Sequence, residues 1–487
     1  MNPLWTLLPP LAVVPFILLF GEKRKNYREG AIIVAGLALL WINNLIYTDL
    51  MAGNTPQSGE FALLANYSLK LSAEPMGVIF GLLASFLWVV TTVYSIGYMR
   101  GHHEINQTRF YTCFAIALAA VMAAAYADNL LTLFVAYEVI TLSTFPLVTH
   151  AGGDAAKRAG RVYLGILMAT SIGLLLPAVI WTTTASGNMQ FVPGGVLQEA
   201  GLSNGALAVL LALFVFGIAK AGLMPFHRWL PAAMVAPTPV SALLHAVAVV
   251  KTGVFSILKI VVYTFGIDTV TVSGAAYWLL PFAGFTVIAA SIVAFTKDNL
   301  KARLAYSTIS QLAYIVMAAL LATVMSVSGG VLHIVMHAFG KITLFFCAGA
   351  VLVALHRSEI SKLDGVGWKM PITMGAFTIG AISIIGLPPA GGMWSKLLIA
   401  GGSLDTGTII WVMVLMLSTL LNIAYLLPIP MRAFLRRDPE LAPGERPVMQ
   451  EAPFACLWPI VLTATACILL FLYPKPLTEL IGLIQWR

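Results

Sequence analysis

One carboxyl group and five lysine ammonium groups lie within apolar stretches of this chain that are long enough to span a membrane. The acid is Glu138, and the bases are Lys220, Lys251, Lys259, Lys341 and Lys396. Glu138 follows Asp128 by ten residues, which corresponds to ~15 Å of helix and places it near the middle of a bilayer. A charge at that depth costs at least ~2.5 kcal/mol. A buried acid together with several buried bases therefore indicates a pathway for ions.

The chemistry that these residue types suit best is proton transfer. Burial disfavours the charged forms of both carboxyl and ammonium groups, so each can exchange a proton closer to neutral pH than in water. A couple of Glu138 and Lys220 could then exist as an ion pair or as two neutral groups. A charge arriving on a neighbouring lysine would shift that balance by Coulomb repulsion. The alternative is a static salt bridge that holds two helices together.

Histidines accompany the lysines at helical spacing. His245 and Lys251 lie six residues apart in one apolar stretch, and His333, His337 and Lys341 recur at intervals of four on one helix face. Imidazole is the natural proton carrier near neutral pH. A proton wire, structural hydrogen bonding and metal or haem ligation all remain open for this stripe. Because no glutamate separates the two histidines and no Cys or Asp lies near them, we expect no metal and no cofactor.

Two further features are weaker candidates. Lys259 lies near the end of its apolar stretch, where its side chain is expected to extend outward to the surface. A polar stripe follows the stretch 302–324: Ser307, Ser310, Gln311 and Tyr314. It could hydrate the route around Lys341, although single hydroxyls more often bond to their own helix.

The composition shows which elements must position these residues. The chain has 487 residues, of which 59% are hydrophobic and 10% are charged, and its mean hydropathy is +0.90. This balance excludes a soluble domain and predicts an all-α polytopic membrane protein that forms a single membrane domain over residues 1–487. Each predicted span is long enough to cross ~30 Å of hydrocarbon. The fourteen predicted spans are 3–20, 30–48, 76–98, 110–127, 129–149, 161–183, 206–226, 238–264, 275–296, 302–324, 329–355, 371–401, 408–431 and 454–473.

Basic residues predict the orientation of these spans. The basic cluster at 21–29 follows the first span instead of preceding it, so we predict a retained span and not a signal peptide. If that cluster is cytoplasmic, twenty of the 28 Lys and Arg residues fall in cytoplasmic loops. Only Lys70, Lys475 and Arg487 fall on the other side. We therefore expect both termini to lie outside. The net charge of +8 reflects this topology and gives no support to nucleic-acid binding.

The four cysteines lie in apolar stretches and lack the paired spacing of a metal site. They are Cys113, Cys347, Cys456 and Cys467. We interpret them as small packing residues that indicate no redox or metal chemistry.

The interior of the chain divides into two related halves. Residues 110–264 contain five predicted spans with charges in the second and fourth, Glu138 and Lys220. Residues 275–431 contain five more, with charges in the third and fourth, Lys341 and Lys396. Since five is an odd number, adjacent copies must have opposite orientations. The sequence thus predicts an inverted five-helix repeat, which is a recurrent design of transporters.

Proline and glycine predict broken helices beside the buried lysines. The segment 220–231 should end one helix, and Pro237 and Pro239 should begin the next. The second break is formed by Pro388, Pro389, Gly391 and Gly392. It should interrupt the helix just before Lys396. Backbone groups freed at this depth need protein or water partners, so we expect a hydrated ion site, with a packing kink as the alternative.

Several sequence runs around these residues resemble the antiporter-like subunits of respiratory complex I and its relatives. The runs are the Glu138 helix, Lys220-Ala-Gly-Leu-Met-Pro-Phe-His-Arg-Trp-Leu-Pro, Ala-Pro-Thr-Pro-Val-Ser-Ala-Leu-Leu-His245, Val-Val-Lys251-Thr-Gly-Val-Phe, His333-Ile-Val-Met-His-Ala-Phe-Gly-Lys341 and Gly-Met-Trp-Ser-Lys396. The resemblance covers about residues 75–470 and implies fourteen helices with an inverted repeat. It also implies roles for single residues. Glu138 and Lys220 would form the ion-pair couple, Lys251 would be the first central lysine, Lys396 would be the terminal lysine, and the connecting residues would be His333, His337 and Lys341.

Departures from the family pattern distinguish which subunits of the family this chain resembles most. Tyr137 stands where the family usually has Trp, which changes the neighbour of the acid but not the acid. Lys396 differs from the complex I subunit that has a terminal glutamate. About fourteen residues follow the last predicted span, which is too short for the lateral helix of the largest complex I subunit. The chain is most similar to the D-type subunits of multisubunit Mrp-type Na⁺/H⁺ antiporters, followed by their equivalents in membrane-bound hydrogenase-type complexes.

The resemblance implies a proton-translocating subunit of a multisubunit antiporter that exchanges Na⁺ or another monovalent cation for protons. The alternative is a pumping subunit, itself non-catalytic, of a redox-driven complex; a structural scaffold is a third interpretation. Either function implies other membrane subunits as partners. A single buried carboxylate among lysines suits protons better than Na⁺, so we expect any Na⁺ to travel through a partner or an interface.

Overall fold

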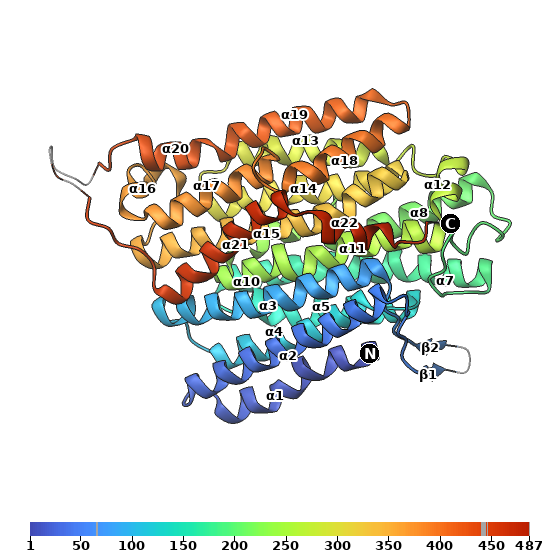
Figure 1. Cartoon of the computed structure of the whole chain (residues 1–487), viewed down its shortest axis with the longest axis horizontal. Coiled ribbons are helices and arrows are strands. Elements are labelled where there is room, and N and C mark those ends of the chain that lie inside the picture. The colour runs from blue at the N-terminus through green and yellow to red at the C-terminus, as the bar shows by residue number, and fades with distance from the viewer. Residues whose placement is uncertain (65–66, 440–444, 446, 487) are drawn as a thin grey trace.

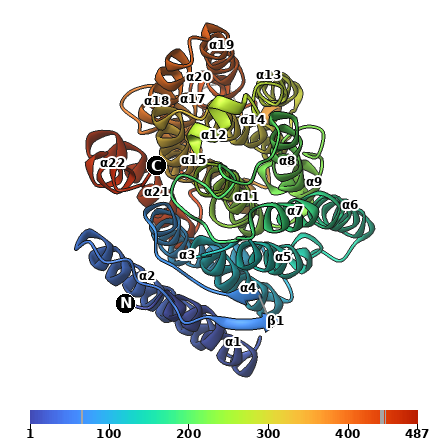
Figure 2. The same ribbon diagram turned by 90° about the vertical axis from the view of Figure 1, so that its right-hand side faces the viewer.

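Long helices lie side by side along the molecule (Figure 1), and the view along them shows a bundle (Figure 2). The structure is a computed structural model, and it describes residues 1–64, 67–439, 445 and 447–486. The predicted outer residue Arg487 therefore lies outside the described residues. An antiparallel hairpin of β1 (Phe61–Leu64) and β2 (Tyr67–Leu69) occupies one polar connection. Apart from this hairpin, the described elements are helical, as the composition predicts.

The helices long and apolar enough to span a membrane match the predicted set. Eleven such runs are described: η1–α1 (Pro3–Phe20), α2 (Lys25–Met51), α3 (Pro75–Gly101), α4 (Gln107–Ala125), α5 (Leu130–Val148), α6–α7 (Asp154–Ser186), α10–α11–η6 (Thr238–Phe265), α14 (Leu300–Leu321), α15 (Val324–Leu355), α19–α20 (Ile409–Leu435) and α21 (Phe454–Leu472). Three shorter apolar helices are α8 (Asn204–Gly217), α13 (Leu280–Thr296) and α17 (Pro371–Ile385). Each segment overlaps one predicted span, so this is an integral multi-pass membrane protein.

The remaining elements are short or subdivide these runs. The α-helical ones are α1 (Leu8–Phe20), α6 (Asp154–Thr170), α7 (Leu176–Ser186), α9 (Trp229–Ala232), α10 (Thr238–Ala242), α11 (Val249–Ile260), α12 (Ile267–Ser273), α16 (Val366–Lys369), α18 (Gly392–Asp405), α19 (Ile409–Leu426), α20 (Pro428–Leu435) and α22 (Lys475–Gly482). Single 3₁₀ turns form η1 (Pro3–Leu7), η3 (Ala219–Ala221), η4 (Ala233–Val235) and η7 (Ile360–Lys362). π-Helical turns form η2 (Ser171–Leu175), η5 (Leu243–Val247) and η6 (Val261–Phe265).

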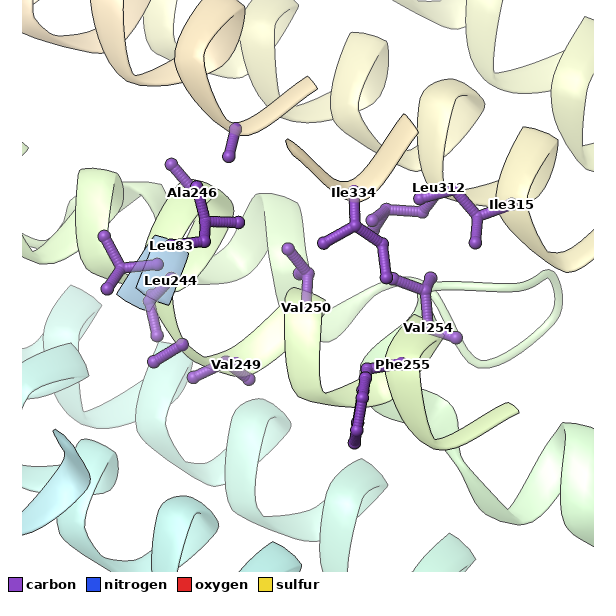
Figure 3. Close-up of a cluster of buried hydrophobic side chains, with 14 of the residues drawn as sticks. Leu83, Leu244, Ala246, Val249, Val250, Val254, Phe255, Leu312, Ile315 and Ile334 are labelled. Atoms are coloured by element: carbon purple, nitrogen blue, oxygen red, sulfur yellow. The ribbon is translucent and has the colours of Figure 1, made fainter. Parts of the chain in front are cut away.

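The centre of the bundle is built around α15. This helix contacts several others, among them α3, α10, α11, α14, α17, α18 and α21. In Figure 2 it lies among them, inside the bundle. The run Thr238–Phe265 beside it is completely buried. Figure 3 shows the apolar packing between α11, α14 and α15, where Val250 and Val254 lie near Ile334, Leu312 and Ile315. Because lipid is itself apolar, such close packing is what holds membrane helices together.

Both termini lie at the same end of the bundle. The amino group of Met1 pairs with Asp49 at the end of α2, and Leu483 and Gln485 line a cavity together with Leu50. This end also carries the β-hairpin (Figure 1). A chain that crosses a membrane an even number of times begins and ends on the same side, which accounts for the shared end. That this end faces the outside of the cell stays a prediction.

The predicted helix breaks are present. Pro237 caps α10 and Pro239 lies in its first turn. The predicted span 371–401 is two helices, because α17 ends at Ile385 and α18 begins at Gly392. The break near Lys220 comes slightly earlier than predicted, since α8 already ends at Gly217. Breaks thus fall in the fourth span of each proposed repeat, although the inverted repeat itself stays a prediction.

Candidate proton pathway

Lys220 lies in the single turn η3 that follows the end of α8. Its ammonium donates hydrogen bonds to the backbone oxygen of Tyr137 and to Oγ1 of Thr141, both at 2.6 Å, and lies 3.1 Å from the Tyr137 ring centre. Gly253 of α11 permits the close approach of this turn, because a Cβ there would lie 2.5 Å from the Lys220 carbonyl carbon. The break in the helix thus brings a fully buried ammonium against the face of α5.

The expected ion pair between Glu138 and Lys220 is not formed. Both carboxylate oxygens of Glu138 are buried and have no hydrogen-bond partner among the described residues. Tyr137 and Thr141 are four residues apart and share the face of α5 that meets Lys220, whereas Glu138 lies ~100° further around the helix. An unpartnered carboxylate at this depth is costly, so this position requires water or a different side-chain conformation. Glu138 and Lys220 therefore do not form the predicted direct ion pair in this structure, while their role as a proton couple stays a prediction.

His245 lies in the π-turn η5, which sequence reasoning did not predict. Neither ring nitrogen has a hydrogen-bond partner among the described residues, and the ring packs 4.5 Å from that of Phe345. The turn separates α10 from α11, so His245 and Lys251 do not share one regular helix. π-Turns of this kind are frequent at functional sites.

The closest link in the predicted pathway joins Lys251 to His337. The Lys251 ammonium nitrogen lies 2.6 Å from Nδ1 of His337, and both side chains are buried. His337 stacks on His333 with ring centres 5.8 Å apart, and Nδ1 of His333 lies 2.8 Å from Oγ of Ser395. The stripe on α15 therefore connects α11 on one side to α18 on the other.

Lys341 extends the stripe toward a third helix. Its ammonium donates to Oγ of Ser307 at 2.6 Å and lies 3.4 Å from the carbonyl oxygen of Leu304, both on α14. The Tyr425 hydroxyl donates to the same Ser307 oxygen at 2.9 Å. Successive members of the stripe, four residues apart, thus contact α18, α11 and α14.

Lys396 lies in the first turns of α18, directly after the predicted break. Its ammonium donates to the carbonyl oxygen of Ile385, the last residue of α17, at 3.0 Å, and lies 4.9 Å from the ring of Tyr314. A Cβ at Gly392 would lie 1.9 Å from the carbonyl oxygen of Ser383, so only glycine allows this approach. The break therefore supplies a free carbonyl that binds the lysine.

Polar atoms without partners mark where water must enter this region. Both amide atoms of Gln311 and the Nε2 atoms of His333 and His337 are buried without hydrogen-bond partners among the described residues. On α14, Gln311 lies one turn from Ser307 and one turn from Tyr314, which contact Lys341 and Lys396 respectively. Buried polar atoms are normally satisfied, so ordered water is expected here. This supports the predicted hydration of the route.

One member of the predicted polar stripe does not take part. Ser310 donates to the backbone oxygen of Val287 and lies 2.9 Å from the hydroxyl of Ser291, and it faces α13. Residues 307, 311 and 314 share a helix face, whereas 310 lies on a neighbouring one. The prediction that all four residues line one route is wrong in this respect.

Lys259 is a weak candidate in the sequence, and its position in the structure differs from the predicted one. Its side chain was expected to reach the surface, but it is fully buried. The ammonium donates to the backbone oxygen of Ala127 at 2.7 Å and lies 3.2 Å from Oε1 of Glu74. The sequence feature that could have indicated a partner for Lys259 is Glu74, an acid directly before Pro75 at the start of a predicted span.

The arrangement suits proton transfer better than binding of a cation. Among the described residues, no group of three His, Cys, Asp or Glu side chains is placed to hold a metal ion. The buried row consists of ammonium, imidazole and hydroxyl groups, which exchange protons, and offers few of the oxygen ligands that hard cations require. These features define a polytopic membrane protein with a buried row of basic side chains across its centre.

Comparison with known proteins identifies the family. A family model described as NADH:quinone oxidoreductase/Mrp antiporter, TM, matches residues 127–422, which is more than half of the chain. The chain belongs to this family, which confirms the resemblance to complex I antiporter-like subunits. It is 28% identical over 483 residues to NADH-quinone oxidoreductase subunit N of Desulforudis audaxviator (strain MP104C), covering 97% of this chain and 95% of the relative. It spans only 54% to 63% of the length of four other curated relatives.

Two solved structures share the fold over nearly the whole chain. One is a chain of the membrane-bound sulfane sulfur reductase, an archaeal respiratory membrane complex, with a TM-score of 0.86, 23% identity and coverage of 98% of this chain and 96% of that chain. The other is a chain of the Mrp complex from Dietzia sp. DQ12-45-1b, with a TM-score of 0.79, 22% identity and coverage of 99% and 94%. At these identities the likeness concerns the fold alone.

Proposed function

We propose that this protein is a proton-translocating subunit of a multisubunit membrane complex. The observation that carries the proposal is the 2.6 Å contact between Lys251 and His337, since it joins two helices through groups that can both carry a proton. Protons would pass between Glu138 and Lys220 on one side and Lys396 on the other. The connecting residues would be His245, Lys251, His333, His337 and Lys341.

A charge at one end of this row would influence the others electrostatically. In a poorly hydrated interior, charges ~6 Å apart interact by several kcal/mol even with partial screening. Protonation of one lysine would therefore favour release of a proton from the next. A relay of this kind moves protons without a large movement of helices.

The partners are other membrane subunits. One relative is named as subunit N of NADH-quinone oxidoreductase, and the two solved chains with this fold belong to the sulfane sulfur reductase complex and the Mrp complex. We place the complex in a bacterial or archaeal cytoplasmic membrane, with the end that carries both termini on the outside.

Two energy sources are consistent with this row of residues. In the first, the chain is the D-type subunit of an Mrp-type antiporter, in which proton entry drives Na⁺ or another monovalent cation outward; the fold likeness to a chain of the Mrp complex supports this. In the second, the chain is a pumping subunit of a redox-driven complex, as the name of its relative suggests. In neither case does the row of lysines provide a Na⁺ site, so Na⁺ would cross through a partner or an interface.

The test measures Na⁺ and proton flux in inverted vesicles that hold the whole complex, with and without an electron donor. The wild type is compared with Glu138→Ala and Lys396→Ala. Exchange driven by a pH gradient alone, and abolished in both variants, would identify the antiporter. Pumping that appears only with an electron donor, and is lost in both variants, would identify the redox-driven complex. Wild-type fluxes in both variants would contradict the proposed proton route.

A further inference from the structure

A buried lysine, Lys259, forms an ion pair at the end of the bundle that carries both termini. Glu74 precedes α3, and its carboxylate accepts hydrogen bonds from the backbone N–H groups of Met76 and Gly77. The same carboxylate lies 3.2 Å from the Lys259 ammonium and accepts a hydrogen bond of 2.8 Å from the Tyr263 hydroxyl. Lys259 and Tyr263 both come from the α11–η6 run, which also carries Lys251.

A cavity connects this pair to the end of the bundle. It has a volume of about 360 Å³, and its lining includes Glu74, Lys259, Tyr263 and Asp128 together with Ser72 and Gln485. The Glu74 side chain is 19% exposed, whereas that of Lys259 is 0% exposed. A cavity of this size has room for several waters. Water can therefore reach the carboxylate, and the ammonium lies directly behind it.

The charged groups around the pair are few. Asp128, in the connection before α5, pairs with Lys70 at 3.4 Å, and Lys70 also lies 3.7 Å from Glu60. These three residues form an outer network in which Asp128, although it lines the cavity, pairs with Lys70 and not with Lys259. Glu74 is thus the carboxylate that faces Lys259.

An apolar barrier separates this pair from the central row. Lys251, Phe255 and Lys259 are spaced by four residues, so they share one face of α11 with Phe255 in the middle. The Phe255 ring packs 4.9 Å from that of Phe80 on α3, and the Lys259 ammonium lies 5.6 Å from the Phe255 ring. Figure 3 shows Phe255 at the edge of the apolar cluster. An aromatic constriction of this type can close a water path by drying it.

We propose that Glu74 and Lys259 form a proton-exchange site between the outer aqueous phase and the central row, with Phe255 as its gate. The proposal rests on the proposed proton-translocating function. The Lys259 ammonium gives a proton to a carboxylate oxygen of Glu74, so an N–H bond breaks and an O–H bond forms. Glu74 then releases the proton to water in the cavity. A proton that passes Phe255 from Lys251, ~12 Å away along α11, restores the ammonium.

The alternative is a purely structural ion pair that ties α11 to the start of α3, and Lys259→Arg distinguishes the two. Arginine keeps the positive charge and the pairing with Glu74, but it does not lose a proton in proteins. A structural pair predicts wild-type flux in this variant. A proton-exchange site predicts loss of flux while the complex still assembles. Lys70→Arg is the matched control, since it makes the same change in the neighbouring outer ion pair and should leave flux intact.

The experiment measures proton flux in sealed vesicles that hold the whole complex, with assembly checked by size-exclusion chromatography. Loss of flux in Lys259→Arg, with normal flux in Lys70→Arg, is the expected result. Normal flux in Lys259→Arg would overturn the inference and leave the proposed function intact. A wild-type complex without proton flux under either energy source would instead contradict the proposed function.

Two further variants test the cavity and the gate. Ser72→Cys, made in a Cys113→Ser background, places a thiol in the cavity lining. A charged, membrane-impermeant thiol reagent should then inhibit flux only when it is added to the face that carries the termini. Inhibition from the opposite face, or labelling without inhibition, would contradict an outer opening. Phe255→Ala should raise the passive proton leak of the vesicles, and an unchanged leak would show that Phe255 is not the barrier.

Discussion

His337→Gln is the sharpest single test of the central row. Glutamine can still accept a hydrogen bond from Lys251 through its side-chain oxygen, but it cannot carry a proton as imidazole does. In the native protein the ring centres of His333 and His337 are 5.8 Å apart. Without His337 the next carriers on α15 are His333 and Lys341, separated by eight residues or ~12 Å. The variant thus roughly doubles the gap between titratable groups on this helix.

The expected consequence is a large loss of flux with little loss of stability. A proton path needs one hydrogen-bonded link for every ~2.8 Å, so the gap grows from about two links to about four. Removal of a positioned proton carrier typically lowers a rate by about 10²- to 10⁴-fold, so a loss of about 100-fold is expected.

The assay is proton flux by the reconstituted complex, followed with a pH-sensitive dye. His150→Gln is the matched control, because His150 is also buried and its ring nitrogens have no hydrogen-bond partner among the described residues. His150 lies just beyond the end of α5, outside the proposed row. More than half of the wild-type flux in His337→Gln, or an equal loss in both variants, would refute the reasoning.

Three further predictions follow from individual contacts. Gly253→Ala should destabilise the protein by about 1–3 kcal/mol and lower flux, because its Cβ would lie 2.5 Å from the Lys220 carbonyl carbon; unchanged thermal unfolding would contradict this close approach. Gln311→Leu should lower flux without lowering the thermal midpoint, since it removes unpartnered polar atoms that hold water; unaltered flux would show that no water path passes there. Hydrogen bonds from Arg432 hold the pKa of Asp364 below its ordinary value, so the stability gained from this pair is present above ~pH 4 and is lost only at lower pH. Arg432→Gln should therefore lower stability by about 1 kcal/mol or less, and equally at every pH from about 5 to 8; a loss that changes over this range would contradict the pairing.

Features that depend on local sequence were predictable. Long apolar runs require helices that satisfy their own backbone groups, so the spans could be placed from hydropathy alone. The break before Lys396 was equally local, because Pro388 and Pro389 cannot continue a helix. The spacing of His333, His337 and Lys341 fixed their common face before any tertiary contact was known.

Features that depend on tertiary contacts were not predictable. Whether Lys220 binds Glu138 or the neighbouring Tyr137 carbonyl depends on the rotation of α5 against η3, which hydropathy does not report. The pairing of Lys259 with Glu74 joins residues far apart in the chain. The π-turn at His245 arises within a strongly apolar run whose local sequence gives no sign of it.

The most direct test of the account is proton flux by the complex carrying Lys251→Arg. Arginine keeps a positive charge beside His337 but cannot release a proton. The account predicts a complex that assembles normally and no longer moves protons under either energy source. Wild-type proton flux in an assembled Lys251→Arg complex would contradict it.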